Sequence, residues 1–340
     1  MEALRRMQNV SSCCCFHISD NKTSYVLKKN NEVDAVHRVE SYIMTQAFLR
    51  KTCWTIIFIL IMHHEAISGG TLPGDSSGQA YAVPFPEGIF FWDTPTYGWR
   101  PNAVAPGVDA NSFANIPAFL WATPLSPLGG RLELAATIPS LFVGFPNTTG
   151  HEQLSARRGL YNSLFAAIWA FDLGNGFNVS FLSGGYIPED PGKTGVSTNA
   201  WVAREGLNLA YLSDGWKAAA NLTYQRQGNN LTTNLPSAND NFVYDLTFTK
   251  TQNKLEFGAV AFGSCDVDKR AMNLPAASQF AMGGIIGYDF GNLETQIYAT
   301  HDVAQRNLGG YETRIWSRVA VPLWTPPGKI TSQDFLEKEF

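Results

Sequence analysis

An alternation of apolar and polar side chains with a period of two residues recurs along this chain after residue 83. In residues 311–323 the odd positions carry mainly apolar or small side chains, whereas the even positions include Glu312, Arg314 and Arg318. Residues 242–249 alternate in the same way. Because successive side chains of a β-strand point to opposite faces, this pattern predicts strands with one apolar face and one polar face.

The alternating stretches predict about twelve strands joined by connections of two kinds. The strands are expected at 83–92, 113–122, 130–139, 160–173, 176–187, 198–213, 215–226, 240–251, 254–264, 278–290, 292–302 and 310–324. Long connections are expected near 93–112, 140–159, 188–197, 227–239, 265–277 and 303–309, and short ones between them. Tight turns at one end and long loops at the other are typical of outer-membrane barrels. We therefore predict an all-β fold, a transmembrane antiparallel β-barrel of about twelve strands.

The composition agrees with a barrel that faces lipid. Only 16% of the residues are charged and 13% are aromatic. No stretch of about 20 consecutive apolar residues could span a bilayer as a helix. A soluble β-sandwich or a secreted barrel is the main alternative, since these folds also alternate. The asymmetry of the connections favours a barrel in the membrane, because closure in lipid makes an apolar exterior tolerable.

The charge of the chain argues against nucleic acid as a partner. Residues 69–340 contain 17 Lys and Arg residues and 23 Asp and Glu residues, which gives a net charge of 17 − 23 = −6. They contain no basic cluster of the kind that neutralises phosphates. We therefore expect no contact with nucleic acid.

A secretory signal peptide is expected at 44–68. The basic pair Arg50-Lys51 precedes an apolar stretch that ends at Met62, and small residues lead to a predicted cleavage after Ser68. The apolar stretch is too short to cross a bilayer as a helix. This order of basic, apolar and small residues predicts export from the cytoplasm.

The signal peptide divides the chain into four expected parts. These are a non-native extension or mis-assigned start at 1–43, the signal peptide at 44–68, the barrel at 69–324 and a polar tail at 325–340. Either Met1 or Met44 is the true start. Four of the five cysteines precede residue 69, so no disulfide is expected within the mature chain.

The expected barrel contains little that could carry out catalysis or bind a metal. Its histidines are His151 and His301, and no serine lies in a recognisable nucleophile motif. The pair His301-Asp302 is interpreted as an ordinary strand end, and the Asp266–Asp268 stretch lacks the glycine and glutamate of a calcium loop. We predict no enzymatic activity, no catalytic residues, no metal and no cofactor.

The polar faces of the predicted strands form the candidate site, which is the lumen. The lining candidates are Arg204, Asp245, Glu294, Tyr298, Arg314, Trp316 and Arg318. Two interpretations of their mixed charges remain open. They either pair with one another and hold the strands together, or line a route for an amphipathic solute.

Motifs spread over about 79–324 resemble a known family. They are Asp172-Leu173-Gly174-Asn175-Gly176, Tyr186-Ile187-Pro188, Asn199-Ala200-Trp201, Asp214-Gly215-Trp216 with the following Leu222-Thr223-Tyr224, Gly287-Tyr288 and Arg318-Val319-Ala320-Val321-Pro322-Leu323. In their order they are similar to the outer-membrane family named "putative MetA-pathway of phenol degradation". The resemblance implies a barrel that admits aromatic or other hydrophobic compounds, and it implies no particular binding residues. The tail at 325–340 departs from the usual barrel, whose last strand closes the chain.

Two functions follow as expectations. The first is a channel or transporter in the cell outer membrane for small hydrophobic or aromatic compounds. The second is a structural barrel, or one that contacts host or envelope partners, without solute transport. A barrel enzyme that acts on lipid is a third and weaker class. The expected partners are outer-membrane lipid, a small hydrophobic or aromatic solute and the barrel-assembly machinery.

Overall fold

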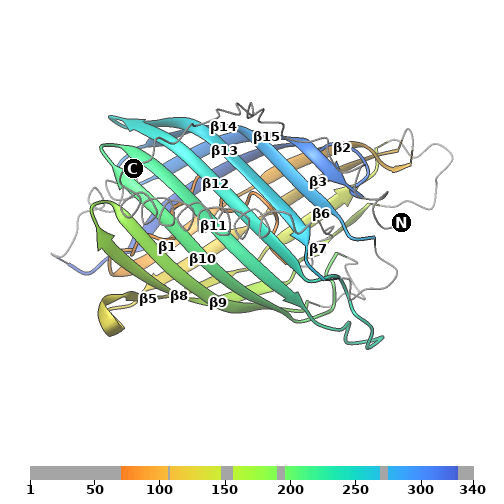
Figure 1. The fold of residues 1–340 in the computed structure, drawn as a ribbon, viewed down its shortest axis with the longest axis horizontal. Helices are drawn as coiled ribbons and strands as arrows, with labels where there is room; N and C mark the ends of the chain where they lie inside the picture. The colour runs from red at the N-terminus through yellow and green to blue at the C-terminus, as the bar shows by residue number, and fades with distance from the viewer. Residues whose placement is uncertain (1–69, 106–107, 147–155, 190–195, 269–274, 328–340) are drawn as a thin grey trace, which may run out of the picture. The chain divides into compact units, whose positions relative to one another are not determined.

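The structure is a computed structural model that describes residues 70–105, 108–146, 156–189, 196–268 and 275–327. The predicted extension at 1–43, the predicted signal peptide at 44–68 and residues 328–340 of the predicted tail lie outside the described residues. Within the described residues, the chain forms one closed antiparallel sheet that follows the chain order (Figure 1).

The wall of the barrel contains two kinds of strand. The continuous strands are β9 (Phe177–Ile187), β10 (Val202–Ser213), β11 (Trp216–Gln227), β12 (Asn241–Gln252), β13 (Leu255–Asp266), β14 (Ser278–Asp289), β15 (Glu294–Arg306) and β16 (Thr313–Trp324). The interrupted strands are the pairs β1 (Gly88–Asp93) with β2 (Thr96–Ala105), β3 (Val108–Asn115) with β4 (Pro117–Ala122), β5 (Arg131–Thr137) with β6 (Ser140–Gly144) and β7 (Arg157–Leu160) with β8 (Ser163–Gly174). Because β16 pairs with both β1 and β2, the sheet closes. Over the described residues these strands confirm the predicted barrel of 12 strands.

The interruptions of the first four strands lie side by side. They fall at Thr94–Pro95, Ile116, Ile138–Pro139 and Tyr161–Asn162. Proline has no backbone N–H to donate to a neighbouring strand, so Pro95 and Pro139 break the ladder where they occur. The remaining backbone groups still pair, since the Tyr161 N–H donates to the Pro139 carbonyl at 2.8 Å. The strands on this side of the barrel are therefore interrupted at one level.

Two of the predicted long connections are wrong, because strands occupy these residues. Residues 93–112 contain β2 and β3, which are joined by the two residues between Ala105 and Val108, and residues 140–159 contain β6 and part of β7. Prolines and glycines in these stretches indicate loops, but here the prolines lie at interruptions of strands. The first strand also begins at Gly88 and not at 83. The residues before Gly88 enter the barrel.

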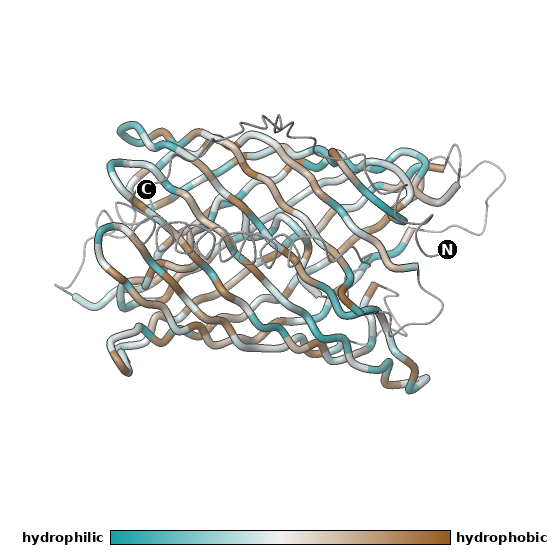
Figure 2. Tube along the Cα trace, in the orientation of Figure 1, coloured by the Kyte–Doolittle hydropathy of each residue, from teal (hydrophilic) through white to brown (hydrophobic). Residues whose placement is uncertain are grey.

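The outer face of the barrel is apolar. Strand residues that point outward include many large hydrophobic side chains with exposed surface, for example Phe113, Phe181, Phe248, Ile286 and Ile297. Figure 2 shows hydrophobic and hydrophilic residues following one another along the strands. A closed wall with this outer face has the properties that a hydrocarbon environment requires. The fold is thus that of an outer-membrane barrel.

The inner face divides into an apolar half and a polar half. Phe90, Trp92, Leu120, Ile168 and Leu182 belong to one buried apolar cluster on β1, β4, β8 and β9. Buried polar side chains gather on the inner faces of β11 to β16. The prediction that the polar faces of the strands form the lumen does not hold for the first strands, because their inward positions hold aromatic and aliphatic residues.

Candidate functional site

Residues 70–87, which precede β1, lie inside the barrel, and we call them the inner segment (drawn orange in Figure 1). Successive turns shape it, since the Ser77 N–H donates to the Gly74 carbonyl and the Gln79 N–H to the Ser76 carbonyl. Gly74 has a φ of +94° and lies against the ring of Phe262, where a Cβ atom would approach to 2.7 Å. A glycine is required there by both its backbone conformation and its surroundings.

Asp245 on β12 holds the middle of the inner segment. Its carboxylate accepts hydrogen bonds from the Gly74 N–H at 2.9 Å, from the Ser76 N–H at 3.0 Å and from the Ser76 hydroxyl at 2.6 Å. One buried carboxylate therefore fixes three donors of the inner segment.

A buried ion pair supports the next turn of the inner segment. The Lys217 Nζ lies 2.9 Å from a carboxylate oxygen of Glu256 and donates to the Gly78 carbonyl at 2.8 Å. The Gln296 side chain also donates to Glu256, at 2.9 Å. Because both charged groups have partners, their burial does not leave an uncompensated charge.

The predicted aromatic and arginine residues of β15 and β16 form a stack against the same segment. Tyr298 and Trp316 lie parallel, with ring centroids 5.2 Å apart, and the Tyr298 hydroxyl donates to the Gly74 carbonyl at 2.9 Å. Arg318 donates to the Ser77 carbonyl at 2.8 Å. Three candidates from the sequence therefore contact one short piece of chain.

The remaining candidates make other contacts in the lumen. Arg314 donates to Glu312 at 2.6 Å and to the Ser112 hydroxyl at 2.7 Å, which links β16 to β3. Arg204 donates to the Tyr186 hydroxyl at 3.1 Å. The Glu294 side chain is buried. The Arg314 guanidinium also lies over the Trp316 ring, 5.5 Å from its centroid, so Arg314 adjoins the stack, whereas Arg204 contacts Tyr186 on β9.

The alternation in the sequence does not predict the inner segment. Residues 70–82 show no alternation, so the strand pattern says nothing about them. Their signal is a run of small and turn-forming residues upstream of β1, Pro73-Gly74-Asp75-Ser76-Ser77-Gly78. Such a run exposes many backbone N–H and carbonyl groups, and these are the groups that the polar half of the lumen binds.

A cavity of about 360 Å³ lies between the inner segment and the interrupted strands. Its wall includes Leu72, Pro73, Ala114, Ile116, Pro139, Leu141, Tyr161, Val196 and Thr198 together with Asp75, Tyr186 and Arg204. Burial raises the pKa of the Asp75 carboxyl from its usual 3.8 to about 7, although Arg204 and Arg318 lie nearby and oppose this shift. The cavity is mainly apolar, and its polar lining residues come from the inner segment and from several strands.

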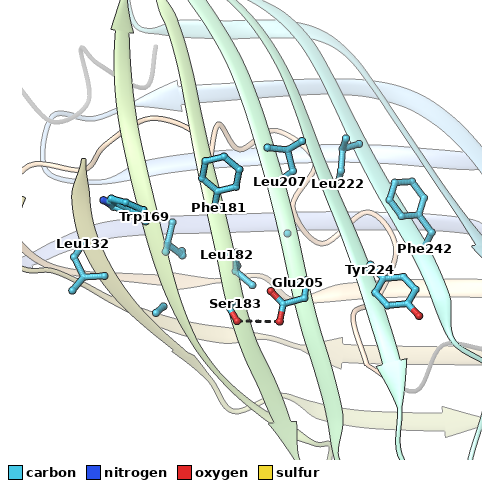
Figure 3. A pocket seen from close by; sticks show the side chains of 13 residues that line it. Leu132, Trp169, Phe181, Leu182, Ser183, Glu205, Leu207, Leu222, Tyr224 and Phe242 are labelled. Atoms are coloured by element: carbon cyan, nitrogen blue, oxygen red, sulfur yellow. Dashed lines mark hydrogen bonds between the residues drawn. The ribbon is translucent and has the colours of Figure 1, made fainter. Parts of the chain in front are cut away.

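A second hollow, of about 590 Å³, lies on the face of the wall turned away from the lumen. Figure 3 shows its lining, in which the Ser183 hydroxyl donates to Glu205 at 3.0 Å among apolar side chains such as Phe181 and Leu207. Because Glu205 points outward, its neighbour Arg204 points into the lumen. In the sequence, the adjacent charged residues Arg204 and Glu205 leave open which of the two faces the lumen.

The residues considered for catalysis do not assemble. His301 is exposed on the outer face, where its Nδ1 lies 2.8 Å from the Thr313 hydroxyl, whereas Asp302 is buried in the lumen and accepts a bond from Gln279. Within the described ranges, no group of three His, Cys, Asp or Glu side chains could hold a metal ion. In the same residues, no helix is long and apolar enough to cross a bilayer.

The chain matches one family model and is similar in fold to solved barrels. The model described as "Putative MetA-pathway of phenol degradation" matches residues 78–319. An outer membrane channel from Pseudomonas putida F1 has a TM-score of 0.61 at 13% identity, over 74% of this chain and 99% of that one. The translocator domain of the autotransporter NalP from Neisseria meningitidis has a TM-score of 0.41 at 11% identity, over 69% and 88%. No curated protein matches the sequence significantly.

Proposed function

Because this chain belongs to the family described as "Putative MetA-pathway of phenol degradation", whose model covers residues 78–319, we propose that it is an outer-membrane channel for small hydrophobic or aromatic compounds. The family membership expected from the sequence is confirmed. The observation that supports transport most directly is the mainly apolar cavity inside the barrel, because its 360 Å³ falls within the size range of small-molecule sites.

The inner segment determines how a solute passes in this proposal. It fills the lumen beside the cavity and is held by Asp245, Lys217 and Arg318 on the polar half of the barrel. The cavity is bordered by Val196 and Thr198, which belong to the long connection between β9 and β10. A solute enters the cavity from that end, and it leaves when part of the inner segment moves.

We propose two further partners. The apolar outer face contacts outer-membrane lipid, and a barrel of this kind depends on the barrel-assembly machinery for insertion. We propose no enzymatic activity, since His301 and Asp302 point to opposite faces of the wall and cannot act as a pair. The charged lumen residues then serve to hold the inner segment and to shape the route.

Uptake must be measured across a barrier that slows apolar solutes. Apolar aromatics cross a phospholipid bilayer unaided, so the protein is reconstituted in vesicles whose outer leaflet contains lipopolysaccharide. We expect faster entry of radiolabelled toluene than in protein-free vesicles, and no comparable gain for sucrose. Equal entry of toluene with and without the protein contradicts the proposal and favours a structural or interaction barrel.

A further inference from the structure

The hollow on the outer face of the wall is a trough that crosses several strands, and we call it the outer trough (Figure 3). Paired positions on neighbouring strands form its two rows, which are Trp169-Phe181-Leu207-Leu222 and Ala167-Ser183-Glu205-Tyr224. The first row is apolar and consists of large side chains, whereas the second begins with the small side chains of Ala167 and Ser183. A trough of about 590 Å³ with this lining has room for an extended apolar chain.

One ionisable side chain, Glu205, interrupts this apolar surface. It is exposed and points away from the lumen, and its Oε1 accepts a hydrogen bond from the Ser183 hydroxyl at 3.0 Å. Within the described residues, its Oε2 has no hydrogen-bond partner. Ionisable side chains within a membrane are costly and rare, and those that occur usually serve a function. Since a carboxyl accepts hydrogen bonds whether or not it is ionised, Glu205 offers an acceptor to a donor that lies in the outer trough.

Arg226 adds a cation beside the outer trough. It is exposed, points outward like Tyr224 and is the last residue but one of β11. Ala203 lies opposite Arg226 and Gly185 lies opposite Ala203, so small residues adjoin it on that side. Arg226 forms no ion pair with the described residues. A guanidinium binds phosphate through two parallel N–H groups, and Arg226 is therefore suited to the phosphate of a lipid.

The levels of Arg226 and Glu205 in the wall point to the outer leaflet. β11 ends one residue after Arg226 and a long connection follows, so Arg226 lies at the external end of the barrel. Glu205 pairs with Tyr224, two positions further into the wall, which is roughly 7 Å along the strand. The cation thus lies at the level of lipid headgroups, and the carboxyl lies where acyl chains begin.

We propose that the outer trough binds one lipopolysaccharide molecule through its lipid A. Arg226 binds a phosphate, and Glu205 accepts a hydrogen bond from the 3-hydroxyl of an acyl chain. The chain itself lies along Phe181 and Leu207. A glycerophospholipid has a phosphate but no hydroxyl on its acyl chains, so it satisfies Arg226 alone. Because the outer trough lies outside the lumen, this site does not depend on the solute that the channel admits.

Native mass spectrometry of the folded protein in detergent micelles tests the proposal with two lipids, lipid A and phosphatidylglycerol. We expect each barrel to retain one lipid A, with an affinity roughly tenfold or more above that for phosphatidylglycerol, because only lipid A donates to Glu205. Equal affinity for the two lipids overturns the proposal. A lipid-free pair of barrels also overturns it, because a second copy of the chain would then cover the outer trough.

Variants locate the two polar contacts. Glu205→Leu removes the acceptor, so it should lower the affinity for lipid A about tenfold and leave that for phosphatidylglycerol unchanged. Glu205→Gln should retain most of the affinity, because an amide oxygen also accepts a hydrogen bond. Arg226→Ala should lower the affinity for both lipids about tenfold, since both contain a phosphate.

The matched control is Arg158→Ala. Arg158 is also exposed and lies opposite the outward Phe142 on β6, but it is not part of the outer trough. This variant should bind lipid A like the unchanged protein. If Arg158→Ala weakens binding as much as Arg226→Ala does, or if Glu205→Leu binds lipid A like the unchanged protein, the assignment is overturned. Heat-modifiability on cold SDS gels verifies that each variant is folded.

Discussion

At the scale of single residues, Asp245 has the largest share in keeping the inner segment in place, and its removal should open the lumen. Asp245→Ala leaves the N–H groups of Gly74 and Ser76 without an acceptor. Each unpaired buried donor costs about 1–3 kcal/mol, so docking of the inner segment should weaken by about 2–6 kcal/mol. We expect more frequent and larger openings in single-channel recordings from planar bilayers.

The matched control for Asp245→Ala is Asp172→Ala. Asp172 also accepts a backbone hydrogen bond, from the Gly174 N–H at 2.8 Å, but it lies in an exposed turn at the end of β8. This variant should conduct like the unchanged protein. If Asp245→Ala conducts no more than Asp172→Ala, the inner segment is not the element that closes the lumen.

At the scale of elements, two glycines at the turn between β8 and β9 allow the cost of backbone strain to be compared with the cost of a steric clash. Gly174 has a φ of +81° and no atom within 4 Å of an added Cβ, whereas Gly176 has a φ of +82° and its Cβ would lie 2.1 Å from the Leu212 carbonyl oxygen. Gly174→Ala should cost about 1–2 kcal/mol through strain alone. Gly176→Ala should cost more, as measured by urea unfolding from liposomes. Equal costs would show that the Leu212 backbone moves away freely.

The inner segment is a second element, and its deletion tests whether the barrel wall folds without it. Deletion of residues 70–82 should leave a heat-modifiable barrel, because β1 and β16 still close the sheet by their own pairing. The deletion variant should conduct continuously, whereas the full protein should conduct little. Loss of the heat-shifted band would show instead that the wall needs the inner segment in order to fold.

The elements also show what the sequence can and cannot predict. The alternation predicts β9 to β16 because every second residue of a strand meets the same environment, and it predicts one common face for Asp245, Tyr298 and Arg318. It fails for β2 and β3, since prolines that mark a loop in most chains here mark an interruption within a strand. It cannot find the inner segment, whose irregular backbone is held by contacts more than a hundred residues away, such as Gly74 with Asp245.

At the scale of the whole molecule, the unequal halves of the interior explain how one barrel holds its own chain and still keeps a cavity. The polar half on β11 to β16 binds the backbone of the inner segment through Lys217, Asp245 and Arg318. The opposite side is mainly apolar and offers the inner segment few hydrogen bonds, and a cavity remains between the two. The cavity lies in the space that remains, lined by Ile116 and Pro139.

The apolar outer face is suited to lipid, and a charged side chain placed on it tests whether lipid surrounds the barrel. Leu246 lies in the middle of β12, points outward and is 38% exposed, whereas Leu231 is 60% exposed in the long connection between β11 and β12. An arginine at the middle of a lipid-facing strand costs about 2–4 kcal/mol, and near the interface about 0–1 kcal/mol. Leu246→Arg should therefore lower the free energy of unfolding from liposomes by about 2–4 kcal/mol and reduce the heat-shifted band in the outer-membrane fraction, while Leu231→Arg should change neither. If both variants unfold like the unchanged protein, water and not lipid surrounds the wall, and the barrel then cannot be a membrane channel.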